Sequence, residues 1–592
     1  MDLSTSASSS DNQLDGFPES QPLLPVTHDS LRITFKEKLA RANFLPRKLH
    51  LPSKSAVLIL FWSLLVGAIY MTAKEGTKLA AKLFVQEKGL EDFYSYDILL
   101  TRLIFVLVFL LYPFAGFLAD VCYGRCRVIM VSLCLLLCGM TFLSMDSIFI
   151  FTRYTVTPFS ANRQGGVTLF FVFATCGLCF LVVGFAGYEA NFIQLGIDQL
   201  NDAPSEYLGL FVHWVEWFAM LGTTFAQITF SLINYCNRNE NYAIYHMTLS
   251  LPLLFLTLLV VMLVFTCWKR RWFNIEQVRS NPYKMVIKVL KFAIKQYPAS
   301  YSTCPDEEPS RLDLAKEVYR GPFKTEQVED VKTFLRILVI LLALGPLFSL
   351  EVPIGPVLHI FIEHIIKRRE GAYANCSPGN IILDVSSLKS LLTVILFPIY
   401  VWLIYTVLRQ CIPKIFTRIK VGALALILGL MGMFLIELFG HILYSEHHDN
   451  RVMCMFREQQ RLEKITNISS SLYLPWSVSL APGFLTQAGI TVIITTTFEF
   501  ISAQSPHSMK GLLFGVMFAI RGVFQLLTAV GTLPFSLVKI WGTRDREMKS
   551  NPPAVFSCGF GYLLFSCIMG LLGLILFLMA IKRYRYRERR YG

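Results

Sequence analysis

Long uninterrupted apolar runs constrain the fold of this chain more than any other feature of its sequence. A helix needs about 20 consecutive apolar residues to cross the hydrocarbon core of a bilayer, and about twelve such windows are present. Only 16% of the residues are charged, against roughly 25% in soluble proteins. The alternating segments of ~10 residues that build membrane barrels are not seen in the sequence. We therefore expect an all-α integral membrane protein with spans at 55–73, 97–118, 127–146, 167–193, 207–233, 244–267, 334–363, 386–408, 421–443, 477–498, 512–536 and 554–580.

The net charge of +14 is concentrated in particular loops. Basic residues gather in "YGRCR" (123–127), "KRRWFNIEQVR" (269–279), "RQCIPKIFTRIK" (409–420) and the final "KRYRYRERRYG" (582–592), while "KRRE" (367–370) is an exception on the other side. Positive charge beside spans is retained on the cytosolic face. This pattern predicts that both termini are cytosolic and that the partner is the lipid bilayer, with no nucleic acid bound.

Two sequons, at Asn375 and Asn467, fall in loops predicted on the far side of the membrane, where glycosylation would occur. Cys376 and Cys454 lie in far-side loops too, so either a disulfide between them or two free thiols is compatible with the sequence. No metal-ligand cluster of any specificity is found in the sequence, and we expect no metal.

The polar segments between and around the spans divide the chain. Residues 1–54 have the composition of a disordered cytosolic tail. Residues 268–333 form a cytosolic linker in which "KMVIKVLKFAIKQY" (284–297) has the spacing of an amphipathic helix at the membrane surface. The linker separates two six-helix halves, 55–267 and 334–580, and a basic cytosolic tail follows at 581–592. Two such halves are typical of transporters built from internal repeats.

The N-terminal tail contains "ESQPLL", in which Glu19 lies four residues before Leu23 and Leu24. This spacing resembles the acidic dileucine signal for sorting to endosomes and lysosomes, which clathrin adaptors recognise. A chance match is the other interpretation. We expect a multi-pass protein of the lysosomal or endosomal membrane, with the plasma membrane as the alternative.

Two junctions occupy equivalent places in the two halves. "GIDQLNDAPSEYLGLF" (196–211) and "EFISAQSPHSMKGLLF" (499–514) each join an acidic residue at the end of one span to a proline that can begin the next. Each carboxylate lies near a basic loop of its own half, which predicts ion pairs that form a cytosolic gate. A static bridge that only fixes topology is the alternative. The gate candidates are Asp120, Arg125, Arg127 and Asp198 in the first half, and Lys414, Arg418, Lys420 and Glu499 in the second.

Four segments together resemble one family. "GFLADVCYGRCR" (116–127) is similar to the loop pattern of the major facilitator superfamily. "VGFAGYEANFIQLGIDQL" (183–200), "FKTEQVEDVKTFLRIL" (323–338) and above all "EFISAQSPHSMKG" (499–511) resemble the proton-dependent oligopeptide transporter family. The resemblance implies the major facilitator fold and movement of di- and tripeptides, in some members histidine or nitrate. It also implies the proton as coupling ion and no other cofactor. A dileucine signal of this kind is typical of the endolysosomal peptide/histidine branch.

The chain departs from the family at the residues that usually handle charge. In place of E-x-x-E-R-F in the first helix it has "GAIYMTAKEGTK" (67–78), which sets Gly67, Tyr70 and Met71 where those charges belong. Glu189 stands at the fourth-helix lysine, and Ile490 stands at the tenth-helix glutamate.

Ionisable residues inside spans are costly and are therefore candidates for the substrate and proton pathway. For Glu189, a proton-carrying role and a structural pair with Lys74 or Lys78 are both open. Arg521 suits a substrate carboxylate, and a bridge to Glu351 is its alternative. His213 is either a packed residue or a proton relay. The full set is Lys74, Glu75, Lys78, Glu189, His213, Glu216, Glu351 and Arg521, with Arg102 as a further intramembrane charge.

The function predicted is secondary active transport, namely proton-coupled symport of small peptides or histidine by alternating access. The alternatives are a carrier of another metabolite or anion, a uniporter, or a transport-inactive endolysosomal scaffold or sensor. No nucleotide loop or nucleophile motif indicates an enzyme.

Overall fold

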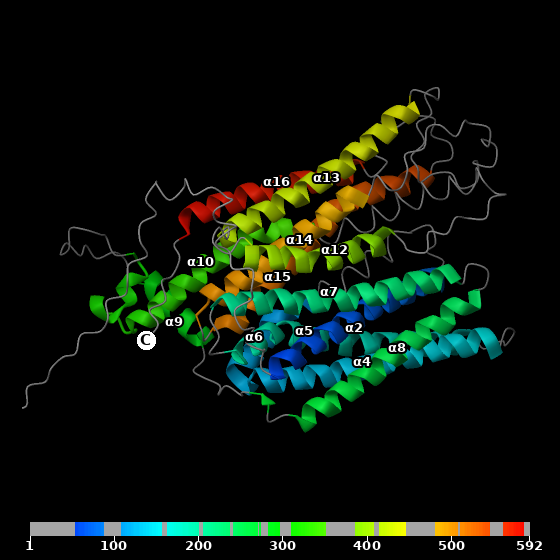
Figure 1. The fold of residues 1–592 in the computed structure, drawn as a ribbon, viewed down its shortest axis with the longest axis horizontal. Helices are drawn as coiled ribbons and strands as arrows, with labels where there is room; N and C mark the ends of the chain where they lie inside the picture. The colour runs from blue at the N-terminus through cyan, green and yellow to red at the C-terminus, as the bar shows by residue number, and fades with distance from the viewer. Residues whose placement is uncertain are drawn as a thin grey trace, which may run out of the picture.

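A computed structural model describes residues 54–87, 108–156, 163–200, 205–236, 241–269, 272–273, 282–295, 310–350, 385–407, 414–445, 480–506, 509–544 and 560–584. Within these ranges the chain is almost entirely helical, and the helices form two bundles that lie side by side along their length (Figure 1). The order of the elements follows the order of the predicted spans.

The first bundle is built from residues of the first half. Its members are α2 (Lys54–Glu87), a helical segment (Val108–Tyr123) that ends in the π-helical turn η2 (Leu118–Tyr123), α4 (Arg125–Val156), α5 (Arg163–Glu189), α6 (Phe192–Asp198), α7 (Ser205–Cys236) and α8 (Asn241–Trp268). The second bundle contains α10 (Thr325–Phe348), α12 (Val385–Trp402) with the π-helical η6 (Leu403–Val407), α13 (Ile415–Ser445), α14 (Leu480–Gln504), α15 (Lys510–Arg544) and α16 (Phe560–Arg583).

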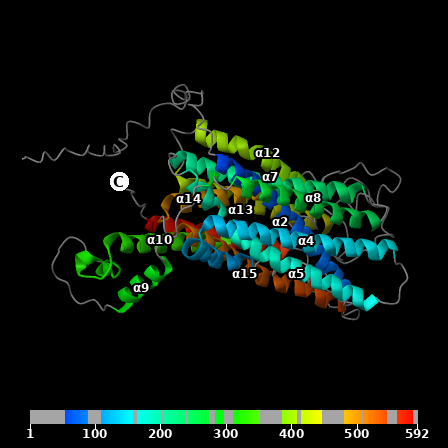
Figure 2. The same ribbon diagram turned by 90° about the horizontal axis from the view of Figure 1, so that it is seen from below.

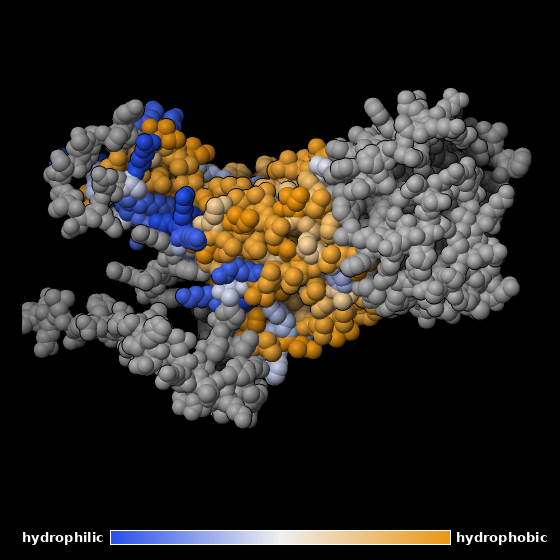
Figure 3. All heavy atoms as spheres, turned by 90° about the horizontal axis from the view of Figure 1, so that it is seen from above, coloured by the Kyte–Doolittle hydropathy of each residue, from blue (hydrophilic) through white to orange (hydrophobic). Residues whose placement is uncertain are grey.

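Nine helices in the described ranges are long and apolar enough to cross a membrane. Their exposed side chains form a hydrophobic belt across the middle of the molecule, and hydrophilic residues gather beyond one end of it (Figure 3). The seventh span differs from its prediction, because its helix begins at Thr325 rather than 334. The early turns of α10 are polar, so a hydropathy window does not include them.

The two bundles and the helices within them approach closely at glycines. A Cβ at Gly67 on α2 would lie 2.3 Å from the carbonyl oxygen of Ala219 on α7. A Cβ at Gly222 on α7 would lie 1.9 Å from the carbonyl oxygen of Leu64 on α2. Between the bundles, a Cβ at Gly116 would lie 2.6 Å from the carbonyl oxygen of Gly511 at the start of α15. Glycine therefore sets the helix spacing at these contacts, as small residues do in membrane bundles.

The linker contributes α9 (Pro282–Lys295) and two short 3₁₀ turns, η4 (Asp313–Ala315) and η5 (Glu317–Tyr319). Figures 1 and 2 both place α9 beyond one end of the bundles, which we call the linker end. Val289 on the inner face of α9 is fully buried, and Tyr283 packs edge-to-face on Phe117, with ring centroids 4.6 Å apart. The expected amphipathic helix of the linker is thus α9.

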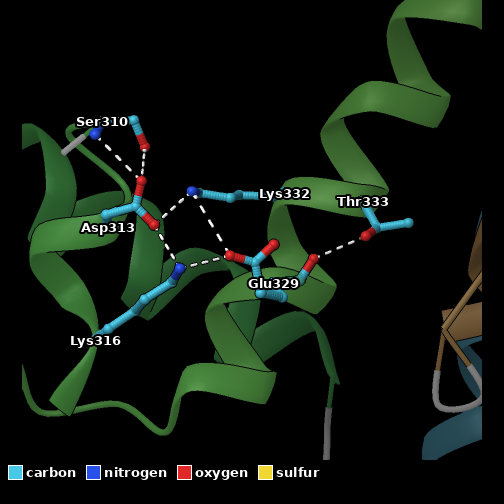
Figure 4. A network of polar contacts seen from close by, with 6 residues as sticks. All are labelled: Ser310, Asp313, Lys316, Glu329, Lys332 and Thr333. Atoms are coloured by element: carbon cyan, nitrogen blue, oxygen red, sulfur yellow. Dashed lines mark hydrogen bonds and ion pairs between the residues drawn. The ribbon is translucent and has the colours of Figure 1, made fainter. Parts of the chain in front are cut away.

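An ionic cluster fixes residues 310–324 to the first turns of α10 (Figure 4). Lys316 Nζ donates to Asp313 Oδ1 and to Glu329 Oε1, each at 2.5 Å, and Lys332 Nζ donates to Asp313 Oδ1 at 2.5 Å. Burial raises the pKa of Asp313, but the hydrogen bonds from Lys316, Lys332 and Ser310 outweigh burial and hold this pKa below its usual range. Burial likewise lowers the pKa of Lys316, and its two carboxylate partners raise it above its usual value overall.

Several predictions fall outside the described residues. They concern the N-terminal tail with Glu19, Leu23 and Leu24, the sequons at Asn375 and Asn467, the cysteines Cys376 and Cys454, and the charges Arg102 and Glu351. These remain predictions.

Candidate functional site

The fourth transmembrane helix is broken just after Glu189, which is the only carboxylate in residues 172–197. The α5 helix ends at Glu189, residues 190–191 form a turn, and α6 continues the path. Asn191 is fully buried in this turn, and its Nδ2 donates to the carbonyl oxygen of Gly187 at 2.9 Å. Broken helices in transporters place polar groups near the binding site. Here the break leaves Glu189 at the C-terminal end of α5.

Glu189 lies in a cluster that draws on both halves. The hydroxyl of Tyr112 donates a hydrogen bond to Glu189 Oε2. Tyr112 is 1% exposed, and its ring lies 4.5 Å from that of Phe518 on α15. Arg521 and Tyr70 are within electrostatic reach of the same phenol. We call Tyr70, Tyr112, Glu189 and Arg521 the midspan cluster.

The midspan cluster joins two residues that the sequence analysis proposed separately. Arg521 lies with its Cζ 5.2 Å from the ring centroid of Phe109, on the same helical segment as Tyr112. Glu189 comes from the first half and Arg521 from the second, so any motion between the halves changes their separation. Tyr112 was missed, because a tyrosine inside an apolar run has no distinguishing sequence signal.

At the linker end of the first half, three charged side chains form a buried triad. Arg125 donates from Nη1 to Asp198 Oδ2 at 2.6 Å, and its Nη2 lies 3.1 Å from Asp120 Oδ1. Gln194 Nε2 donates to the second oxygen of Asp198 at 2.7 Å. Of the two arginines predicted as partners of Asp198, the structure uses Arg125, whereas Arg127 is exposed.

Asp120 also connects the two halves. The backbone N–H of Leu512, in the first turn of α15, donates to Asp120 Oδ2 at 3.1 Å. The first four N–H groups of a helix have no partner within it, so a carboxylate from the first half caps a helix of the second. A carboxylate at this position is favoured by the helix dipole. This cap lies beside the close approach of Gly116 and Gly511.

In the second half, Glu499 on α14 pairs with Arg418 on α13. Arg418 Nη2 donates to Glu499 Oε1 at 2.7 Å, and the arginine side chain is 4% exposed. The described residues show no ion pair of Lys414 or Lys420 with Glu499: Lys414 is exposed before the helix begins, Lys420 is half-buried, and their part in the gate stays a prediction. Successive helical residues rotate by about 100°, so Lys420 points to a different side of α13 from Arg418. Arg418, the third candidate, forms the pair.

Through His213 and Trp217, α7 of the first half contacts the second half. His213 Nδ1 lies 3.9 Å from Glu499 Oε2 and 3.4 Å from the hydroxyl of Tyr405. One turn further on, Trp217 Nε1 donates to the carbonyl oxygen of Val394 on α12 at 2.9 Å. The predicted candidate Glu216 is half-buried on the same helix.

The missing charges of the first helix have a structural reason. Gly67 lies in backbone contact with α7, so no glutamate fits at this position. Ile490 is 3% exposed, in the apolar packing of α14. Lys74 is half-buried on α2, and the side chains of Glu75 and Lys78 lie outside the described part of the structure. The exchanged pair of Lys74 with Glu189 stays a prediction.

Among the residues that the structure describes, no group of three or more histidine, cysteine, aspartate or glutamate side chains is placed to hold a metal ion. The polar groups described above instead suit proton transfer, ion pairing and hydrogen bonding to a polar solute.

Comparisons with known proteins identify a family and proteins of similar fold. A family model, that of the POT family, matches residues 126–537. An auto-inhibited POT family peptide transporter is similar in structure, with a TM-score of 0.58 and 15% identity over 91% of this chain and 99% of that one. The POT family transporter PepTSo gives a TM-score of 0.57 and 14% identity over 90% of this chain and 98% of its own.

Proposed function

This chain belongs to the POT family of membrane transporters, and from that premise we propose that it moves small peptides or histidine by proton-coupled symport. It is a multi-pass membrane protein with the all-α major facilitator fold, and a transporter rather than an enzyme. The observation that carries the proposal is the midspan cluster, where a carboxylate from one half and a guanidinium from the other surround a buried tyrosine.

The cluster supplies the two chemistries that a peptide symporter needs. The guanidinium of Arg521 suits the carboxylate of a peptide or amino acid, because its planar fork matches two oxygens. Glu189 accepts the coupling proton on its carboxylate, and Tyr112 orients that carboxylate through its hydrogen bond. Tyr70 occupies the place where the family carries charge and adds a neutral polar contact.

The contacts at the linker end support alternating access. The Asp120 cap on α15 and the approach of Gly116 to Gly511 hold the halves together there. We propose that these contacts, with the Arg125–Asp198 and Arg418–Glu499 pairs, break when this end opens. The linker end faces the cytosol in this proposal, with both termini cytosolic and the far-side loops glycosylated. The dileucine segment directs the protein to the lysosomal or endosomal membrane through a clathrin adaptor.

A second candidate function is transport of another metabolite or anion, with or without proton coupling. Gly67 in contact with α7 and the buried Ile490 favour it, because neither position can supply the charges by which the family usually binds peptide ends and protons. Arg521 alone would then bind the anionic group of the solute.

Uptake into proteoliposomes separates these functions. Labelled dipeptide and histidine are supplied with and without an inward proton gradient to wild type, Glu189→Gln and the control Glu317→Gln, which changes an exposed glutamate of the linker. We expect gradient-driven uptake in wild type and control and its loss in Glu189→Gln. If folded wild type takes up neither solute under any gradient, the substrate assignment is wrong and other anionic metabolites become the test set.

A further inference from the structure

His213 is completely buried near the start of α7. Its Nδ1 lies 2.8 Å from the backbone carbonyl oxygen of Gly209. A carbonyl oxygen can only accept, so Nδ1 carries the hydrogen and Nε2 holds the lone pair. Nε2 is buried without a hydrogen-bond partner among the residues that the structure describes. Orphaned buried polar atoms are rare in native proteins and call for a functional explanation.

The ring faces the second half of the molecule. Glu499 on α14 and Arg418 on α13 are the two charged groups near it, and Arg418 already occupies one oxygen of Glu499. From α12 and η6, Tyr400 and Tyr405 place their rings 6.3 and 5.5 Å from the imidazole. In the described residues of α2, α6 and α8, which also pack on α7, no charged group comes within electrostatic reach of the ring.

We propose that His213 is a second proton-binding site, separate from Glu189, and that its protonation opens the contact between α7 and α14 at the linker end. The neutral ring fits the closed contact. A proton added to Nε2 would create a buried N–H donor with no acceptor, in a site where Arg418 already supplies one positive charge. Leaving such a group unsatisfied costs about 1–3 kcal/mol, and more when it is charged.

The attraction of Glu499 does not reverse this balance, because its Oε1 is held by Arg418 and its Oε2 is 3.9 Å from Nδ1, the nitrogen that already has a partner. When the halves separate, water reaches Nε2, gives it a proton and hydrates the resulting N–H. The only bond formed is N–H, and the proton returns to water when the contact closes. The inference rests on the alternating access of the proposed function, but it needs no particular substrate.

The size of the effect follows from linkage. A hydrated histidine is half-protonated near pH 6.5, and in this proposal the closed contact holds the ring without a second proton. The ratio of open to closed molecules should therefore rise about tenfold between pH 7.5 and pH 5.5.

Distances between dyes measure this ratio directly. The dyes are attached through noncanonical amino acids at Arg127 and Lys414, which are exposed and lie near the starts of α4 and α13, one in each half. Thiol labels are unsuitable because the chain has 14 cysteines. Single-molecule energy transfer is recorded in nanodiscs without substrate, for wild type, His213→Gln and the control His246→Gln on α8.

We expect the roughly tenfold rise in wild type and in His246→Gln, and none in His213→Gln. A flat wild-type profile, or a His213→Gln profile that still follows pH, overturns the inference. If His213→Gln does not fold, exchange of the C2 proton of His213 in the wild-type chain decides. Its rate must rise through a midpoint between pH 5 and 8, and a ring that does not exchange there refutes the proposal. Failure of peptide uptake leaves these results unaffected, so the two proposals fail separately.

Discussion

Replacing Gly511 with alanine tests whether the contact at the linker end belongs to one state of the transport cycle. A Cβ at this position would lie 2.6 Å from Asp120 Oδ2 and 2.7 Å from Oδ1. Ordinary carbon–oxygen contacts are about 3.3 Å or longer, so α15 or the carboxylate must move by several tenths of an ångström. Overpacking of this kind costs about 1–3 kcal/mol. Because Asp120 and Gly511 belong to different halves, the cost falls on the closed state, which shifts the ratio of open to closed molecules by about 5- to 150-fold.

Amide hydrogen exchange of Leu512 is the assay. Its N–H donates to Asp120 only while the halves are in contact, so its protection should fall by the same factor as the ratio of closed to open molecules. Gly432→Ala is the matched control, since a Cβ there would meet only the side chain of Pro482, at 3.1 Å and within the same half. Unchanged protection of Leu512 in folded Gly511→Ala would show that the closed contact does not carry the energy assigned to it.

Three further changes have expected outcomes. Tyr112→Phe removes a hydrogen bond to Glu189; because such bonds to charged groups contribute about 1.5–3 kcal/mol, we expect a loss of roughly 10- to 150-fold in proton-driven uptake, measured in proteoliposomes. Arg418→Met leaves Glu499 without its ion-pair partner, which should cost about 3–5 kcal/mol in a thermal or denaturant unfolding assay, and adding Glu499→Gln should restore part of it. Asp313→Asn should speed hydrogen exchange of residues 310–324 at pH 7. The pKa of Asp313 in the folded state lies below its ordinary value, so its stabilisation is complete above about pH 4 and is lost as the pH falls further. Wild type should therefore loosen in the same segment only below about pH 4.

Each of these results has a control. Tyr188 is a buried tyrosine next to Glu189 in the sequence, and its Oη has no hydrogen-bond partner in the described ranges. Tyr188→Phe should therefore leave the hydrogen bond from Tyr112 to Glu189 intact. If Tyr112→Phe and Tyr188→Phe behave alike, the bond from Tyr112 has no part in transport. If the double variant at 418 and 499 is no more stable than Arg418→Met, the buried pair is not the source of the loss. Exchange in 310–324 that is equal at pH 7 in wild type and Asp313→Asn would contradict the account of the ionic cluster.

Apolar periodicity and the placement of charge in the sequence were sufficient to predict the architecture. Run length indicates where most of the spans lie, because the bilayer demands a minimum number of apolar residues, but it misses the polar first turns of α10. The equivalent carboxylates Asp198 and Glu499 were also found from sequence, since a charge that ends an apolar run is conspicuous. The sequence offered several basic residues as partners of each carboxylate but could not single out Arg125 and Arg418. The reason is that the pairing depends on the rotation of α4 and α13 about their axes.

The remaining features depend on contacts between distant segments. Nothing near Asp120 in the sequence indicates that it caps α15, some 390 residues away. Tyr112 is one aromatic among many in apolar runs, and Gly67 can be recognised as a spacing residue only when Ala219 is seen against it. The cluster around Asp313 and Lys316 lies in a polar linker with no hydrophobic period to define its fold.

The backbone contact of α2 with α7 has a consequence for how the two ends of the molecule communicate. At Gly67 against Ala219 and at Gly222 against Leu64 there is no room for a side chain between the two helices, so at these two points they resist sliding or rotating past each other. We therefore expect Tyr70 on α2 and His213 on α7 to move together when the halves separate. A displacement at the histidine would then reach the tyrosine through the two helix backbones rather than through a chain of side-chain rotamers.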